Sequence, residues 1–346
     1  MKPSVTRTDM SSRPAQIANR LLALRGQPGE VFLYPHIDTD GDALGSSLAL
    51  LRSLRQIDVR ARLLLDEPVP ERLKFLPALD LIETGAELAA ECAAKQKLAL
   101  LIDCAEAERT GRRRALVEQA EQIAAIDHHI DASQSGGLFW IDPTAAAAGE
   151  MVFDLICQLG KTARAELIDD TNAFLLMTAV VSDTGSFIFS NTSARTFRVA
   201  ASLMARPVDL RQITYQLFDL TSQERLRLMG RLFTDAQFYL SGRLVLATAS
   251  QHLLDEYGAT DQDLDGVINH LRNVGGVEAA FLIREMNDSS LRVSIRGSDS
   301  FNAAEFAGGF GGGGHRKAAG LVLKGLTLAE AAALIRDKAG ERLSKR

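Results

Sequence analysis

The chain has 346 residues, of which 46% are hydrophobic and 24% charged, and its formal net charge is −5. This length suits two domains better than one core, and the negative balance excludes a general attraction for long duplex nucleic acid. The three cysteines form no CxxC pair and no apolar run is long enough to span a bilayer, so we expect a cytoplasmic protein with neither a disulfide framework nor a membrane partner.

Residues 1–15 are mostly polar and predict a flexible tail rather than a secretory signal. From residue 16 to about residue 190, short apolar runs alternate with longer segments of helical pattern. The runs of strand length are Val31–Tyr34, Ala61–Leu65, Leu98–Ile102 and Ile123–Ile126. The helical segments are Ala43–Arg55, Arg112–Gln119, Ala146–Leu159, Ala163–Val181 and Ala194–Leu217. This alternation predicts an α/β domain over residues 16–220, with a parallel sheet and helices on both faces.

A charged amphipathic segment, residues 221–237, predicts a helix that connects two domains. Beyond it the pattern changes, and the chain predicts a smaller α/β domain with a mixed sheet over residues 238–346. The expected strands are Phe238–Leu240, Leu244–Ala249, Ala279–Arg284 and Leu291–Arg296, and the expected helices are Leu264–Val274 and Thr327–Leu343.

Three of the predicted strands run directly into acidic segments. His36–Asp42 follows the first strand, Asp103 the third and Asp127–His129 the fourth, while Asp183 ends a predicted helix. An open parallel sheet forms its active site beyond the carboxyl ends of its strands, so we expect one shared site. Alone, an Asp-Gly-Asp segment is more often a turn, and a His-His pair is more often polar packing. The prediction therefore depends on their joint occurrence.

Clustered carboxylates repel one another, so a pair of divalent cations is the simplest companion for them. Carboxylates with neutral imidazoles and no sulfur suit Mn²⁺, and less strongly Mg²⁺, Fe²⁺ or Co²⁺. Two ions about 3.5–4 Å apart activate water and neutralise phosphoryl charge, which predicts phosphoester hydrolysis. We expect Asp103 to bridge the two ions and His129 to contact the scissile phosphate or protonate the leaving oxygen. The expected metal ligands are His36, Asp40, Asp42, Asp103, His128 and Asp183.

A glycine-rich segment, residues 308–320, is the other strong feature. Its alternative explanation is a flexible linker, but structured segments flank it and His315-Arg316-Lys317 follows the glycines. A run of exposed amides beside cationic side chains predicts an anion-binding turn. Arg296 alternates with buried apolar residues on the preceding strand and is expected to join it. The expected substrate-binding residues are Arg296, Gly312, Gly313, Gly314, His315 and Arg316.

The first-half segments resemble the motifs of the DHH-superfamily phosphoesterases: His36-x-x-x-Asp40-Gly41-Asp42, the lone Asp103, Asp127-His128-His129 and Asp183-Thr184-Gly185. This resemblance implies that the first metal is held by the residues at positions 36, 40 and 103. It implies that the second is held by those at positions 42, 103, 128 and 183, and it supports a catalytic role for the residue at 129.

The second half resembles the DHH-associated C-terminal domain with its GGGHxxAAG motif, which implies that His315 and Arg296 hold a remote phosphate or nucleotide. The two domains together are similar to the NrnA-type nanoRNases. Such enzymes act on very short single-stranded RNA and on 3′-phosphoadenosine 5′-phosphate (pAp), and the family implies a possible homodimer.

The sequence thus predicts a Mn²⁺-dependent phosphoesterase with two ions per site. It does not rank short RNA against pAp or against cyclic and linear dinucleotides such as c-di-AMP and pGpG. Two further alternatives stay open at this point: an inorganic pyrophosphatase or polyphosphatase, and a nucleotide-binding module without catalysis.

Overall fold

The computed structural model describes residues 13–84, 93–129 and 138–344. The chain divides into two compact units, the first ending at Leu220 and the second beginning at Thr221. None of the described helices combines the length and the apolar composition needed to cross a lipid bilayer.

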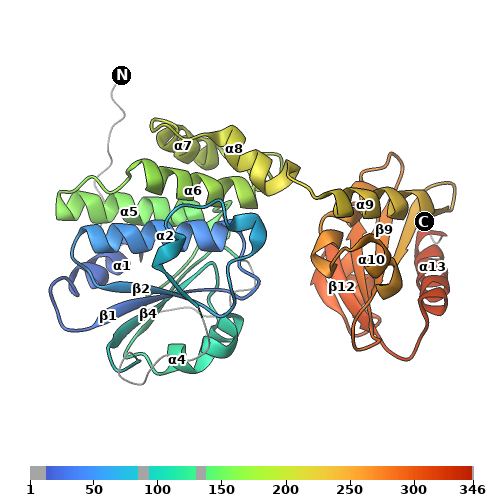
Figure 1. The fold of residues 1–346 in the computed structure, drawn as a ribbon, viewed down its shortest axis with the longest axis horizontal. Coiled ribbons are helices and arrows are strands. Elements are labelled where there is room, and N and C mark those ends of the chain that lie inside the picture. Colours follow the sequence, from blue (N-terminus) through green and yellow to red (C-terminus); the bar gives the residue numbers. More distant parts are fainter. Residues whose placement is uncertain (1–12, 85–92, 130–137, 345–346) are drawn as a thin grey trace. The chain divides into compact units, whose positions relative to one another are not determined.

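A six-stranded parallel sheet forms the centre of the first unit (Figure 1), in the order β3-β2-β1-β4-β5-β6. The strands are β1 (Glu30–Pro35), β2 (Ala61–Leu65), β3 (Ile82–Thr84), β4 (Gln96–Ile102), β5 (Ile123–Asp127) and β6 (Leu138–Ile141). The predicted parallel sheet is therefore confirmed, and the sequence missed only its two short edge strands, β3 and β6.

Successive strand residues point to opposite faces, and helices cover both faces of this sheet (Figure 1). Val31 and Leu33 pack in one core, and Phe32 and Tyr34 pack in another on the opposite face. The first core includes α1 (Arg13–Leu22), α2 (Gly41–Gln56), α5 (Ala148–Ala163) and α6 (Asp170–Asp183). The second core includes η3 (Ala107–Arg113) and α4 (Arg114–Glu118).

The two longest predicted helices are interrupted in the structure. The segment 163–181 is interrupted because Arg164 takes a left-handed conformation that ends α5, and Asp169 then caps α6 by accepting the amide of Asn172. The segment 194–217 is interrupted at Pro207, which has no amide to donate. It forms α7 (Ala194–Leu203), α8 (Leu210–Thr214) and the π-helical turn η4 (Tyr215–Asp219).

The second unit contains a mixed sheet in the order β11-β12-β10-β9-β8-β7, in which only the β8–β9 pair is parallel among the described strands. The strands are β7 (Gln237–Tyr239), β8 (Leu244–Ala249), β9 (Ala279–Glu285), β10 (Leu291–Gly297), β11 (Gly313–His315) and β12 (Ala318–Leu323).

Helices pack on both faces of this second sheet as well. One core contains residues of α12 (Ala303–Gly308) and α13 (Leu328–Ser344). The other contains residues of α9 (Gln223–Asp235), α10 (Gln251–Tyr257), the turn η5 (Asp261–Leu264) and α11 (Val267–Arg272). The segment that we predicted as a connecting helix is α9, and it packs within the second unit through the buried side chains of Leu228 and Leu232.

Candidate metal centre

The carboxyl edge of the first sheet brings together six acidic and histidine side chains. His36 follows β1, Asp103 follows β4 and His128 follows β5. The start of α2 supplies two carboxylates and the end of α6 supplies a third. The structure thus places all six predicted ligands in the first unit: His36, Asp40, Asp42, Asp103, His128 and Asp183.

His36, Asp40 and Asp103 form a first triad whose ligand atoms lie within 4.8 Å of one another. The Nε2 atom of His36 is 3.2 Å from Oδ2 of Asp103. Asp40 caps α2, because its Oδ1 atom accepts the amides of Asp42 and Ala43 at 3.0 Å each. These hydrogen bonds fix the direction of the Asp40 carboxylate, and its Oδ2 atom has no hydrogen-bond partner among the described residues.

Asp42, His128 and Asp183 form a second triad, whose ligand atoms also lie within 4.8 Å of one another. The Nε2 atom of His128 lies 3.1 Å from Asp183 Oδ2, 3.2 Å from Asp103 Oδ1 and 3.7 Å from Asp42 Oδ2. Among the described residues, neither this nitrogen nor Asp103 Oδ1 has a properly oriented hydrogen-bond partner, although both atoms are buried. One nitrogen facing three carboxylates fits a shell of ligands around a cation better than a hydrogen-bond network.

Asp103 faces both triads, with Oδ2 toward His36 and Oδ1 toward His128. Its backbone is in the left-handed region, with φ of 61°. This conformation is uncommon outside glycine but is tolerated by Asp and Asn. A carboxylate with one oxygen directed at each of two adjacent ligand groups has the geometry of a bridging ligand.

The electrostatics of the cluster favour positive charge among its carboxylates. Burial, together with the charges of Asp103 and Asp183, raises the pKa of Asp42 well above its usual value. Burial alone would lower the pKa of His128, but close contact with Asp103 and Asp183 outweighs it and raises this pKa to about 11. Burial would raise the pKa of Asp103, yet the imidazoles of His128 and His36 hold it below its usual range. Divalent cations would supply the same positive charge, and the all-nitrogen-and-oxygen donor set suits them.

Three glycines allow the helices that carry these ligands to approach closely. A Cβ atom on Gly45 of α2 would lie 2.4 Å from the carbonyl oxygen of Leu175 in α6, and one on Gly41 would lie 2.8 Å from Cβ of Ser182. A Cβ atom on Gly149 of α5 would lie 2.6 Å from Cβ of Ala179. The side chain of any other residue at these positions would push α2 or α5 away from α6, and so separate the ligands.

The start of α5 holds Asp42 through its backbone. The residues before this helix are alanines, which offer no side-chain cap. Instead the amides of Ala148 and Gly149 donate to the two oxygens of the Asp42 carboxylate, at 2.6 and 2.8 Å, and Ser46 Oγ donates at 3.1 Å. Asp42 is fully buried. A helix start favours negative charge, so α5 and this metal-ligand candidate stabilise each other, which the sequence did not predict.

His129 lies beside the two triads and is more exposed than the histidines within them. Its Nδ1 atom is 2.7 Å from Oδ1 of the buried Asp127 and 3.8 Å from Oδ1 of Asp103, and its side chain is 38% exposed. The pairing with Asp127 orients the ring. The Nε2 atom of His129 has no partner among the described residues and is available to a substrate.

The predicted substrate-binding residues belong to the second unit. The strand register pairs Arg296 with Ala318, and Ala318 with His315, so these three side chains share one face of the sheet. In the adjacent row, Ser294 pairs with Gly320, and Gly320 with Gly313. Arg296 and His315 therefore stand on either side of a surface formed by very small residues.

Arg296 is partly buried and held in place, because its Nε group donates to Asn269 Oδ1 in α11 at 3.0 Å. Burial lowers the pKa of its guanidinium, which remains a cation at neutral pH. His315 is exposed. Arg316 is exposed as well and donates to the carbonyl oxygen of Asp299. A fixed cation and a nearby imidazole suit a phosphate.

The expected run of free glycine amides is wrong in part. The amide of Gly312 donates to the carbonyl of Ala307 at 2.9 Å, and those of Gly309 and Gly311 are also bonded within the chain. Gly313 and Gly314 belong to β11 and pair with β12. Gly312 and Gly314 meet a steric need instead, since a Cβ atom there would lie 2.3 and 2.6 Å from backbone oxygens of β12. The amides of Gly309, Gly311 and Gly312 are therefore not free to bind an anion.

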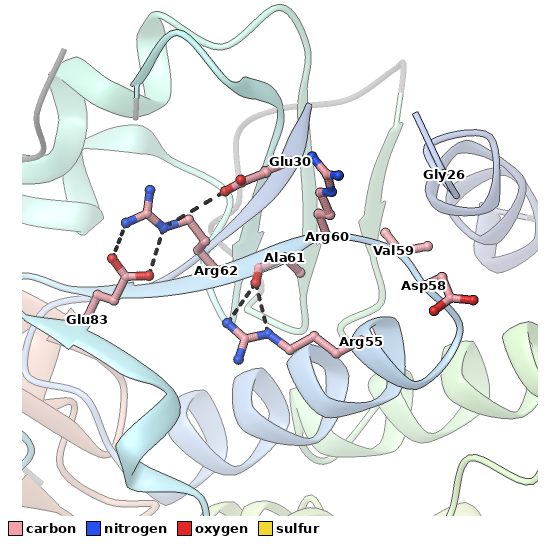
Figure 2. A pocket seen from close by; sticks show the side chains of 9 residues that line it. All are labelled: Gly26, Glu30, Arg55, Asp58, Val59, Arg60, Ala61, Arg62 and Glu83. Atoms are coloured by element: carbon pink, nitrogen blue, oxygen red, sulfur yellow. Dashed lines mark hydrogen bonds and ion pairs between the residues drawn. The ribbon is translucent and has the colours of Figure 1, made fainter. Parts of the chain in front are cut away.

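A hollow of about 630 Å³ lies at the opposite, amino-terminal edge of the first sheet (Figure 2). Two of its arginines are held within the hollow: Arg62 donates to Glu83 at 2.7 Å, and Arg55 donates to the carbonyl oxygen of Ala61 (Figure 2). It contains none of the predicted ligands. This hollow is therefore separate from the candidate metal centre.

Comparison with known proteins identifies the family. The profile of the DHH family, N-terminal domain, matches residues 30–180, and that of the DHHA1 domain matches residues 242–345. The chain is 33% identical over 333 residues to the "Bifunctional oligoribonuclease and PAP phosphatase NrnA" of Thermus thermophilus, covering 94% of each protein. It is 27% identical to the protein of the same name from Bacillus subtilis, over 84% of this chain and 88% of that protein.

A solved structure of an exopolyphosphatase-related protein from Bacteroides fragilis has the same fold, with a TM-score of 0.86 at 21% identity over 99% of this chain and 100% of that one. The chain belongs to the DHH family of metal-dependent phosphoesterases, with an N-terminal DHH domain and a C-terminal DHHA1 domain. The family resemblance that the sequence motifs indicated is thereby confirmed.

Proposed function

We propose that this protein hydrolyses short oligoribonucleotides and pAp with the aid of two divalent cations, Mn²⁺ being the preferred ion. The observation that carries the proposal is the convergence of the two ligand triads at one edge of the sheet, joined by the two oxygens of Asp103. The names of the most similar relatives support the choice of substrates.

In this proposal His36, Asp40 and Asp103 hold the first ion, and Asp42, Asp103, His128 and Asp183 hold the second. Bound ions of this kind make hydroxide available near neutral pH and neutralise charge on the phosphoryl oxygens. The protein fixes the ligand directions beforehand, through the cap made by Asp40 and the amides that hold Asp42.

His129 is proposed to act on the substrate rather than on the ions. Asp127 accepts from Nδ1 of His129 and fixes the ring, so that Nε2 can hydrogen-bond a phosphoryl oxygen or carry a proton to the leaving oxygen. Arg296 and His315 are proposed to bind the remaining phosphate or nucleotide, with a flat base resting on the small residues between them. Arg316 and Gly313 would border the same surface.

The test uses the full chain, stripped of metal and then supplied with Mn²⁺. The substrates are RNA of two to five nucleotides, pAp, c-di-AMP, pGpG and pyrophosphate. We expect mononucleotides from the short RNA and phosphate from pAp, with both activities abolished by a chelator and by His128→Ala. The variant His252→Ala changes an exposed histidine of α10 in the second unit and should retain full activity.

The panel also separates the alternatives. Faster hydrolysis of pyrophosphate than of pAp would favour a pyrophosphatase, and faster hydrolysis of the dinucleotides would favour a dinucleotide phosphodiesterase. Nucleotide binding without turnover in Mn²⁺ would favour a binding module. A homodimer and a cytoplasmic location remain predictions, from the family resemblance and from the cysteine pattern respectively.

A further inference from the structure

The side-chain amide of Asn191 links the two backbone segments that position the carboxylates of Asp42 and Asp183 in the second triad. The Nδ2 group of Asn191 donates to the carbonyl oxygens of Asp183 and Ala146, at 3.0 Å each. Asp183 supplies one carboxylate of the triad. Ala146 lies two residues before Ala148, whose amide holds the carboxylate of Asp42. Asn191 therefore ties the end of α6 to the start of α5.

The chain makes a sharp reversal to bring Asn191 back to this position. Gly185, Ser186 and Phe187 are consecutive left-handed residues, with φ of 54°, 59° and 67°. Two of the three carry side chains, for which this conformation is unfavourable. The reversal is held by backbone bonds, since the Thr184 carbonyl accepts the amides of Ile188 and Phe189 at 2.9 Å. Strain retained next to an active site indicates a functional constraint.

The start of α5 is also held from the other side. Arg195, at the beginning of α7, pairs with Asp142 at 2.7 Å and with Asp154 at 2.8 Å. It also lies 3.4 Å from the fully buried Glu150 in the first turn of α5. With α5 fixed by Arg195, the two hydrogen bonds of Asn191 set the position of Asp183 relative to it.

We propose that Asn191 is a positioning residue for the second cation site, and that it sets the affinity of this site by fixing the separation of the Asp42 and Asp183 carboxylates. The inference rests on the metal centre proposed above. Asn191 acts through backbone carbonyls and not on the ion itself. Loss of such a supporting hydrogen-bond partner typically weakens metal binding by about 10–100-fold.

The test compares Asn191→Ala and Asn191→Leu with the wild-type full chain. Leucine keeps nearly the shape of the side chain and removes both hydrogen bonds. Asn191 is exposed, so both variants should fold, although each leaves the carbonyl oxygen of the buried Ala146 without this donor. Titration of Mn²⁺ into the metal-free protein, followed by calorimetry and by the Mn²⁺ paramagnetic resonance signal, resolves the two binding steps. We expect one of the two steps, the filling of the second site, to be weakened by about 10–100-fold and the other to be unchanged.

Turnover gives an independent measurement of the same effect. The Mn²⁺ concentration for half-maximal kcat should rise in both variants by the same factor as the dissociation constant of the second site. Saturating Mn²⁺ should restore kcat, and KM for the substrate should stay at the wild-type value. A general loss of structure would not be rescued by the metal.

Asn172→Ala is the matched control. The Nδ2 group of Asn172 also bridges two acceptors, the carbonyl of Leu167 and Ser53 Oγ, but at the opposite end of α6. It should lower thermal stability and leave both Mn²⁺ affinities unchanged. Wild-type affinity for the second ion in both Asn191 variants, or equal weakening in Asn172→Ala, would overturn the proposal. A wild-type chain that binds no Mn²⁺ would overturn the metal centre itself, before any variant is compared.

Discussion

The close approach of α2 and α6 leads to a sharp prediction for Gly45→Ala. The new Cβ atom would lie 2.4 Å from the carbonyl oxygen of Leu175, whereas real Cβ atoms keep at least 3.0 Å from such neighbours. The obstacle is backbone in the middle of α6, so it cannot rotate away. The two helices must separate by about 0.6 Å at this point, and each of them carries metal-ligand candidates.

The effects on stability and on activity should differ in size. Overpacking costs about 1–3 kcal/mol, and replacing a helical glycine by alanine returns about 1 kcal/mol. The net loss is therefore at most about 2 kcal/mol, which lowers Tm of a unit of this size by at most about 8 °C. Catalysis is more sensitive, because a displacement of 1 Å can cost about 100-fold. We expect kcat to fall by roughly 10-fold or more.

The assay measures Tm, kcat and Mn²⁺ affinity of Gly45→Ala beside Gly230→Ala. Gly230 lies within α9, and a Cβ atom there would meet nothing within 4 Å. The control should therefore be as stable as the wild type or more stable, with unchanged turnover. If Gly45→Ala retained wild-type kcat and Mn²⁺ affinity, the argument that helix spacing sets the ligand geometry would be refuted.

Four further outcomes are expected. Mn²⁺ at about 100 times its Kd should stabilise the first unit by about 2.7 kcal/mol and raise its Tm by about 5–10 °C, measured by calorimetry; no shift would contradict a metal site there. The pKa of His128 is raised to about 11 in the metal-free protein, so Mn²⁺ binding at pH 7.5 should release at least one proton and should weaken as the pH falls. Calorimetry in buffers of different ionisation enthalpy measures the number of protons released. An absence of proton release would contradict ligation by His128. Arg195→Met leaves the buried Glu150 without its nearest cation and should cost about 3–5 kcal/mol in urea unfolding, whereas Arg195→Lys should recover part of it. Ala318→Val should raise KM by roughly 10-fold, or about 1.4 kcal/mol, at unchanged kcat; an unchanged KM would exclude this surface from substrate binding.

The sequence predicts those strands whose residues are buried on both faces of the sheet and therefore form an unbroken run of apolar residues. β1, β2, β4 and β5 are enclosed by helices on both faces, so nearly every residue is apolar. β3 has three residues, and β6 is an edge strand with three half-buried positions out of four. β3 is too short to give a pattern, whereas β6 is a run of four apolar residues, a signal that the sequence prediction overlooked. Their place in the sheet comes from pairing with strands elsewhere in the chain.

The glycine-rich segment also shows that local sequence does not determine strand pairing. Its composition indicates a turn, because glycine has a low preference for strands. The structure places Gly313–His315 in β11 because the backbone pairs with β12, and within this strand a Cβ atom at Gly314 would not fit. Such pairing depends on neighbours across the sheet and not on local preference.

The metal ligands could be predicted because each follows an element that the sequence itself indicates. Their supporting groups could not. The amides that hold Asp42 belong to Ala148 and Gly149, which lie more than a hundred positions further along the chain, and alanine and glycine suggest no such role. Asn191 is an ordinary loop residue by sequence, and only the return of the chain to Asp183 reveals its contacts.

The left-handed backbone of Asp103 matters for anyone who wishes to crystallise this protein with an uncleaved substrate. Alanine at this position would remove the bridging carboxylate and also strain the loop after β4, since its methyl group disfavours φ of 61°. Asparagine tolerates that conformation and keeps the side-chain shape while losing the charge. Asp103→Asn is therefore the variant of choice for trapping a bound nucleotide, because it silences the chemistry without disturbing the path of the chain.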